Sequence, residues 1–172
     1  MQLYVERGFE QTTVAEIAQL AGVTARTFFR YFADKREVLF AGSTDLQQRL
    51  VDALESTPGS AAPMEAVSAA LAAAAQALGQ HREYSRQRQS VINANADLRE
   101  RELIKMASLS AALAEGLRRR GVDEPDASLA AEAGIVVLRV AFERWISQQS
   151  DGELAQVMRE SLDRLKTVTA AG

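Results

Sequence analysis

The chain has no cysteine and a single histidine, His81. These absences exclude disulfides, thiolate metal sites, cysteine nucleophiles and the usual serine–histidine or cysteine–histidine triads. Prolines number three and glycines ten in 172 residues, and aromatic residues reach only 6%. Because alanine and leucine dominate the apolar residues, the composition favours helices over strands. We expect no metal site and no cofactor.

Long hydrophobic runs are also missing. The most apolar stretch, from Leu129 to Phe142, is interrupted by Glu132 and Arg139 and is too short to span a bilayer. The first ten residues are charged and lack the apolar core of a signal peptide. We therefore expect a soluble, cytoplasmic protein without membrane contacts.

Acidic residues slightly outnumber basic ones over the whole chain, but one segment reverses this balance. The chain has a net charge of −3. Residues 22–36 nevertheless contain Arg26, Arg30, Lys35 and Arg36 against Asp34 alone, which gives this segment an excess of cations. An acidic body with one small basic patch is compatible with a protein that touches DNA through a short element.

The basic segment coincides with a helix-turn-helix pattern. Thr13 and Glu16 have the spacing of a capping box, and Gly22 ends the helix that they begin. Thr24 is a second N-cap, and its helix runs through Phe32. Two short capped helices joined by a tight turn form a helix-turn-helix. Donors, hydroxyls and one aromatic on the second helix suit base edges and phosphates, namely Thr24, Ala25, Arg26, Thr27, Arg30 and Tyr31.

The rest of the chain predicts further helices and no strand. Apolar spacing and breakers place them over residues 34–54, 62–78, 82–95, 97–120, 125–149 and 151–168. The predicted fold is all-α, with an N-terminal three-helix helix-turn-helix DNA-binding domain and a C-terminal helical ligand-binding and dimerisation domain. We place the first domain at residues 1–42 and the second at residues 43–172.

Helix 125–149 is apolar nearly all round, so it cannot bury every side against one core. We assign its second side to a partner subunit. Together with the apolar face of helix 151–168, it predicts a four-helix dimer interface. The candidate dimerisation residues are Val136, Val137, Val140, Met158 and Leu162.

The four helices from 62–78 to 125–149 offer apolar inward faces with few polar groups, which is typical of a small-molecule site. Arg88 lies in such an apolar stripe. It is either a snorkelling or salt-bridged arginine, or a counter-ion for an anionic, amphipathic ligand, since a buried unpaired charge would be costly. The candidate ligand-binding residues are Tyr84, Arg88, Ile92, Asn95, Met106, Ser110 and Phe142.

Motifs in the first forty residues extend well past a bare helix-turn-helix. They are Glu6-Arg7-Gly8-Phe9-Glu10-Gln11-Thr12-Thr13-Val14, Ile17-Ala18, Ala21-Gly22-Val23-Thr24, Phe28-Phe29-Arg30-Tyr31-Phe32 and Lys35-Arg36-Glu37-Val38-Leu39. They closely resemble the DNA-binding domain of TetR family repressors. The resemblance implies a homodimer that binds an approximately palindromic operator in double-stranded DNA and releases it when a small molecule binds. It also implies phosphate contacts from Tyr31 and Lys35, and Thr13 completes the candidate DNA-binding set.

A looser resemblance covers residues 86–145. Its motifs are Ala96-Asp97-Leu98-Arg99-Glu100-Arg101, Leu117-Arg118-Arg119-Arg120-Gly121 and Ala141-Phe142-Glu143-Arg144-Trp145. They resemble the TetR branch with an acyl-CoA-like ligand-binding domain, which implies an acyl-CoA-like effector.

Two other classes of protein compete with this interpretation. No carboxylate has a positioned partner, a glycine-rich phosphate loop or metal-ligand spacing, so we do not expect an enzyme. The alternative is a helical ligand-binding or adaptor protein that uses the helix-turn-helix for protein contacts.

Overall fold

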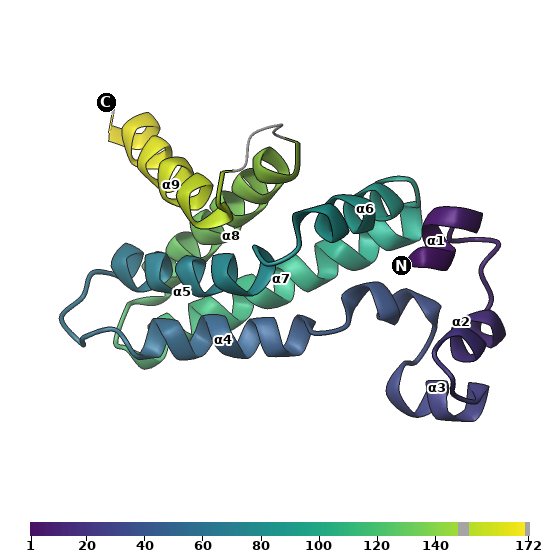
Figure 1. The fold of residues 1–172 in the computed structure, drawn as a ribbon. Helices are drawn as coiled ribbons and strands as arrows, with labels where there is room; N and C mark the ends of the chain where they lie inside the picture. Colours follow the sequence, from purple (N-terminus) through teal and green to yellow (C-terminus); the bar gives the residue numbers. More distant parts are fainter. Residues whose placement is uncertain (148–151, 171–172) are drawn as a thin grey trace.

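The computed structural model describes residues 1–147 and 152–170, and within these ranges the chain is helical and contains no strand (Figure 1). The predicted all-α class is confirmed. The first elements are α1 (Gln2–Arg7), α2 (Val14–Leu20), α3 (Ala25–Tyr31) and the 3-10 helix η1 (Lys35–Phe40). The others are α4 (Ser43–Glu55), α5 (Pro63–Leu78), α6 (Arg82–Asn93), α7 (Ala96–Arg119), α8 (Glu124–Ser147) and α9 (Leu154–Ala170).

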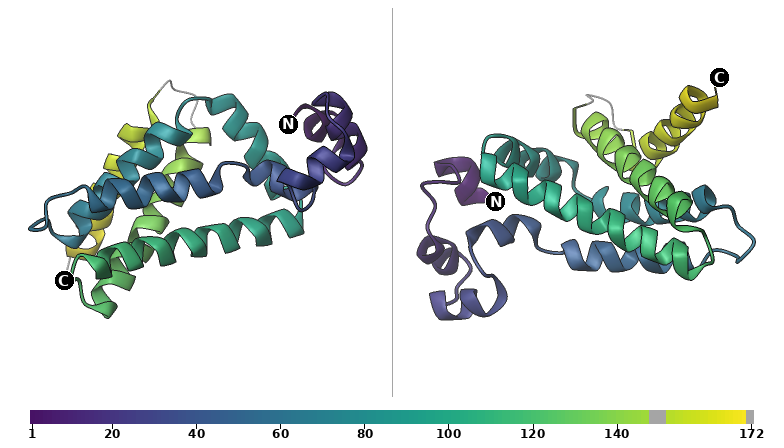
Figure 2. Two further views of the ribbon diagram at one scale, coloured as in Figure 1. Left: turned by 90° about the horizontal axis from the view of Figure 1, so that it is seen from below. Right: turned by 180° about the vertical axis from the view of Figure 1, so that it is seen from behind.

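We call residues 1–40 the N-terminal module and the described residues from 43 onward the helical body. Figures 1 and 2 show α2 and α3 at one end of the molecule, and α8 and α9 toward the other. The predicted ends of two helices near Gln149 and Asp151 lie outside the described residues. No described helix is both long and apolar enough to cross a membrane.

Local capping signals define α2 and α3 as the sequence predicted. The Thr13 hydroxyl accepts a hydrogen bond from the Glu16 amide, and the Glu16 carboxylate accepts one from the Thr13 amide. Thr24 caps α3 by accepting from the Thr27 amide at 3.1 Å. Between the helices Gly22 has a φ of 67°, a conformation that costs glycine little. The two helices therefore cross at a tight, capped turn.

The predicted helix 34–54 is wrong as a single element. It divides into η1 and α4, separated by Ala41 and Gly42. Gly42 has a φ of 83°, in the left-handed region, so the regular helical hydrogen-bonding path is interrupted there. The N-terminal module therefore joins the helical body through a break rather than through a continuous helix.

Close packing of small residues builds the core of the helical body. On α5, Ala66, Ala70 and Ala74 are fully buried. The helix packs against α4, α8 and α9, and α8 also packs against α7 and α9. A Cβ at Gly134 on α8 would lie 2.5 Å from Val67 Cγ1 on α5, so the two helices approach closely where glycine stands.

A second, smaller apolar cluster joins the N-terminal module to the helical body. Its members come from α1, the loop after it, η1, α6 and the start of α7, namely Tyr4, Phe9, Leu39, Phe40, Val91, Ile92 and Leu98. The division at residues 42 and 43 stays a prediction, but the two parts share this buried contact. Through this contact the N-terminal module, which includes α2 and α3, is attached to the helical body.

Candidate nucleic-acid interface

Helix α3 presents an exposed face that combines cations with apolar groups. Ala25, Arg26, Phe29 and Arg30 are all exposed, and their spacing places them on one side of the helix. Phe28, on the other side, is buried and contacts the rings of Phe29 and Phe32. Arg26 makes no ion pair with the described residues, so its guanidinium is available to a partner.

The sequence interpretation missed Phe29. Its side chain is 56% exposed on the same face as Arg26, although an apolar side chain in a short helix suggests a core position. The aromatic pair Phe28-Phe29 gave the only signal, because adjacent residues of a helix cannot both face one core.

Arg30 and Tyr31 form an exposed pair at the end of α3. The Arg30 guanidinium donates a hydrogen bond to the Tyr31 hydroxyl at 2.9 Å and lies 4.8 Å from the centre of its ring. At the start of the helix, the hydroxyls of Thr24 and Thr27 are 3.0 Å apart. Thr13 lies exposed at the start of α2. The structure thus places these predicted contacts on or beside the helix-turn-helix surface.

Lys35 has a structural role that the sequence did not indicate. Its ammonium donates to the carbonyl oxygens of Phe9, Glu10 and Thr12 at 2.8, 3.1 and 3.0 Å, and lies 4.5 Å from the centre of the Phe9 ring. The Lys35 carbonyl accepts from the Tyr4 hydroxyl at 2.6 Å, and burial raises the pKa of that hydroxyl. Lys35 therefore holds the loop between α1 and α2 against η1, and its phosphate contact stays a prediction.

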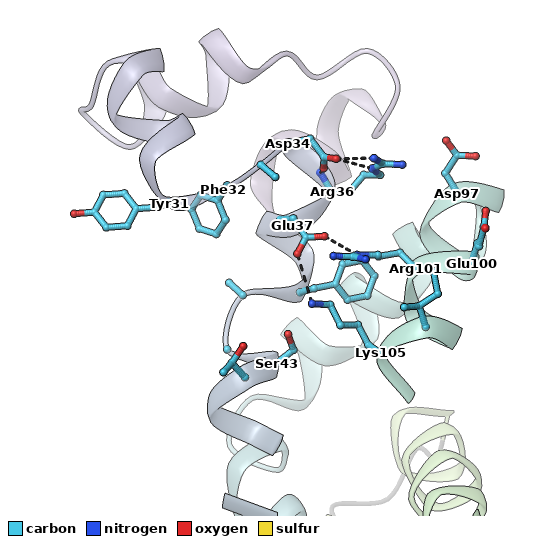
Figure 3. Close-up of a pocket in the computed structure, with 16 residues that line it drawn as sticks. Tyr31, Phe32, Asp34, Arg36, Glu37, Ser43, Asp97, Glu100, Arg101 and Lys105 are labelled. Carbon is cyan, nitrogen blue, oxygen red and sulfur yellow. Dashed lines mark hydrogen bonds and ion pairs between the residues drawn. The ribbon is translucent and has the colours of Figure 1, made fainter. Parts of the chain in front are cut away.

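Charged side chains bridge η1 and α7 (Figure 3). Glu37 accepts from Arg101 Nε at 2.6 Å and lies 3.6 Å from Lys105 Nζ. The hydrogen bond from Arg101, with the nearby Lys105 charge, lowers the pKa of the Glu37 carboxyl, which stays ionised near neutral pH. The bridge borders an open groove of about 800 Å³ between η1, the start of α4 and α7.

Arg88 adds a second polar contact across the same junction. Its Nε donates to the Leu39 carbonyl at 2.7 Å, and its Nη1 lies 3.5 Å from Glu102 Oε1. The guanidinium is also 5.1 Å from the centre of the Phe40 ring. Burial lowers the pKa of this guanidinium. The structure thus favours the salt-bridged interpretation of Arg88, and its role as a counter-ion for a ligand stays a prediction.

The other predicted ligand-binding residues lie in different surroundings. Tyr84 is exposed, whereas Ile92 is fully buried in the smaller apolar cluster. The Asn95 amide donates to the Val91 carbonyl, and the Ser110 hydroxyl donates to Glu132. Met106 and Phe142 pack against the main core. Among the described residues, no group of acidic or histidine side chains could hold a metal ion.

Three of the predicted dimerisation residues belong to the core of their own chain. Val137, Met158 and Leu162 are buried there, because α8 and α9 pack against each other and against α5. Their contribution to a subunit interface stays a prediction, although their side chains already pack within one chain. Val136 and Val140 differ, being 43% and 41% exposed, and Leu129 on the same helix is 70% exposed. The apolar surface of α8 is therefore narrower than predicted.

A capped helix-turn-helix with a basic outward face, joined to a separate helical body, defines a DNA-binding transcriptional regulator. Residues 1–41 match the family model for bacterial regulatory proteins of the tetR family, and residues 61–170 match the model for the MftR C-terminal domain. The chain therefore belongs to the TetR family of transcriptional regulators. This family consists of regulators rather than enzymes, as the sequence predicted.

Individual relatives agree with this assignment. The chain is 38% identical over 73 residues to the HTH-type transcriptional regulator TcmR from Streptomyces glaucescens, a match that covers 42% of this chain and 32% of TcmR. It thus spans about a third of the length of that relative.

Two solved structures from Thermus thermophilus share the fold, each 24% identical to the chain. The TetR family regulator PfmR has a TM-score of 0.53, with 94% of this chain and 91% of PfmR covered. The repressor FadR, solved with lauroyl-CoA, has a TM-score of 0.57, with 96% and 89% covered.

Proposed function

We propose that this regulator binds an approximately palindromic operator as a homodimer and represses transcription until a small ligand binds its helical body. The exposed face of α3 carries the proposal. Arginine forms paired hydrogen bonds with guanine in the major groove, and alanine and phenylalanine suit the thymine methyl group. Arg26, Arg30, Ala25 and Phe29 offer both kinds of contact side by side.

The exposed part of α8 supports the homodimer. Leu129, Val136 and Val140 recur at intervals of seven and four residues, so they form a stripe along one side of a 24-residue helix. A second copy that places the same stripe against it would bury these side chains by two-fold symmetry. Two N-terminal modules related by that symmetry would then read two half-sites of a palindrome.

The effector is proposed to have an apolar body. The core of the helical body is built largely from aliphatic side chains of α4, α5, α7, α8 and α9. FadR, which has the same fold, was solved with lauroyl-CoA, and the motifs of residues 86–145 resemble the acyl-CoA-like branch. Lauroyl-CoA is therefore the first probe to add to a protein–DNA complex. A regulator released in this way would act in the cytoplasm, where its operator lies.

Selection from a random double-stranded DNA library tests the proposal. We expect the wild-type chain to enrich one approximately palindromic sequence. Arg26→Ala should then weaken binding to that sequence by about 5- to 150-fold (about 1–3 kcal/mol), because a base contact is lost. Binding to random DNA should change much less. Arg30→Ala should act in the same direction.

A matched control comes from an arginine on another element. Arg159 on α9 is exposed and lies in the helical body, so Arg159→Ala should leave both affinities unchanged. Equal losses on the enriched and random sequences for both Arg26 and Arg30 would rule out direct base reading by them. If no sequence is enriched, the proposed function itself fails.

A further inference from the structure

Phe29 on α3 is an exposed aromatic side chain whose ring is nevertheless supported from below. The side chain is 56% exposed. The centre of its ring lies 5.4 Å from that of Phe28, and the two ring planes stand at 90°. Phe28 is buried and in turn contacts the Phe32 ring at 5.3 Å. Because an edge-to-face contact with a buried ring favours one orientation of the exposed ring, Phe29 offers a defined apolar surface.

Arg26 lies beside this ring, and its side chain has no ion pair or hydrogen bond within residues 1–147 and 152–170. The two residues are three positions apart, so their side chains are neighbours on the helix surface. A guanidinium carries five donors and no acceptor, and the O6 and N7 atoms of guanine accept two hydrogen bonds from it. The exposed face of α3 thus joins a donor for guanine to an apolar ring.

The other polar side chains of α3 and its N-cap are engaged with one another. The hydroxyls of Thr24 and Thr27 are 3.0 Å apart, and the Arg30 guanidinium donates to the Tyr31 hydroxyl at 2.9 Å. Ala25, one turn before the exposed aromatic ring, adds only a methyl group to this face. The surface on that side of the ring is therefore apolar, and it offers nothing that would tell a carbonyl from an amino group on a base edge.

The spacing of the two side chains along α3 is close to one base step. Three residues of an α-helix rise about 4.5 Å, and successive bases of one DNA strand are about 3.4 Å apart. A recognition helix in the major groove would therefore place Phe29 over the base pair next to the one that Arg26 contacts. Thymine carries a methyl group at C5 in that groove. The base 5-methylcytosine carries the same group at the same atom, whereas uracil and cytosine carry only hydrogen.

We propose that Phe29 and Arg26 together recognise a 5-methylpyrimidine beside a guanine, so that a methylated cytosine takes the place of a thymine in the operator. The inference rests on the proposed function and names the chemical group that is read in each half-site. Because the apolar surface contacts the methyl group alone, thymine and 5-methylcytosine are equivalent to it. Methylation of a cytosine at this position would therefore strengthen binding of the regulator, independently of any ligand in the helical body.

Base substitution in synthetic duplexes tests this inference without altering the protein. The starting duplex is the palindromic sequence that the wild-type chain enriches, and the guanine that Arg26→Ala no longer selects marks the contact of that arginine. Each thymine is replaced in turn by uracil in both half-sites, which removes one methyl group and changes no hydrogen bond. We expect one sensitive thymine, in the base pair next to that guanine. Its replacement should weaken binding by about fourfold per half-site and about 15-fold for both, the value of a buried methyl group.

The same position then compares the two forms of cytosine. Replacing the sensitive thymine by 5-methylcytosine, paired with guanine, should change the affinity by less than about twofold. Replacing it by unmethylated cytosine should weaken binding as much as uracil does, by about 15-fold for both half-sites.

Ratios measured within one variant separate methyl recognition from a general loss of affinity. In Phe29→Ala the ratio of the affinities for the thymine and uracil duplexes should fall to about one, because the apolar contact is lost. Phe29→Leu keeps an apolar side chain and should retain most of the ratio. Leu20→Ala is the matched control, since Leu20 is 60% exposed on α2 of the same helix-turn-helix. It should leave the ratio unchanged.

The outcomes distinguish this inference from the proposed function. Equal wild-type affinity for the thymine and uracil duplexes at every position overturns the inference, as does equal affinity for cytosine and 5-methylcytosine beside the guanine. A ratio that persists in Phe29→Ala, or a sensitive thymine away from the guanine of Arg26, also overturns it. In each of these cases the operator is still bound, so the proposed function stands. If no palindromic sequence is enriched, the proposed function fails and the inference fails with it.

Discussion

Lys35→Met is expected to lower the free energy of unfolding by about 3 kcal/mol, because a charged donor to three backbone carbonyls is lost while the apolar stem stays. The loop between α1 and α2 then lacks its main contact with η1. Chemical denaturation followed by circular dichroism measures the loss. Affinity for DNA should fall to a similar degree on all sequences, because the whole helix-turn-helix rests on this loop.

Arg36→Met is the matched control for this prediction. Arg36 is adjacent, and its partner Asp34 lies in the same exposed segment, so the ion pair holds no second element in place. An exposed pair of this kind contributes little to stability. The family resemblance implies a different result for Lys35, namely a phosphate contact. If Lys35→Met is as stable as the wild type and only DNA binding falls, Lys35 acts mainly as a phosphate contact. Its hydrogen bonds to the loop between α1 and α2 would then contribute little to stability.

The elements that local chemistry determines were predictable from the sequence. The capping box of Thr13 and Glu16, the N-cap at Thr24 and the turn at Gly22 each act within four residues, and the structure has all of them. Helices α5 to α8 begin within a residue of their predicted starts, because breakers and apolar spacing are also local signals.

Partners far apart in the chain were not predictable. Arg88 bonds to Leu39, which is 49 residues away, and the sequence could show only that an arginine stands in an apolar stripe. Gly42 lay inside the predicted helix 34–54, and no local signal indicated its left-handed conformation. Sequence periodicity likewise identified α8 as apolar all round. It could not show which of these apolar residues face the core of the same chain and which face a partner subunit.

The effect of a charge on α8 depends on whether the substituted residue faces the core or the exposed stripe. We expect Val136→Asp to convert a wild-type dimer to a monomer, because two-fold symmetry places two carboxylates in one apolar contact and both lose their hydration. Since Val136 is 43% exposed in the single chain, the monomer itself should fold normally. Affinity for the palindromic operator should drop by about 100-fold or more, because two half-sites are no longer bound by one particle. Sedimentation at micromolar concentration and titration of the operator measure the two effects.

The same charge at a buried position separates assembly from folding. Val137→Asp, one residue along α8 and 3% exposed, should unfold the chain rather than only split the dimer. Leu103→Asp on α7 is the neutral control, since Leu103 is 65% exposed and lies outside the α8 stripe. It should change neither mass nor operator affinity. If Val136→Asp still sediments as a dimer, or the wild type as a monomer, the α8 stripe is not the subunit interface. A palindromic operator would then need a different source of symmetry.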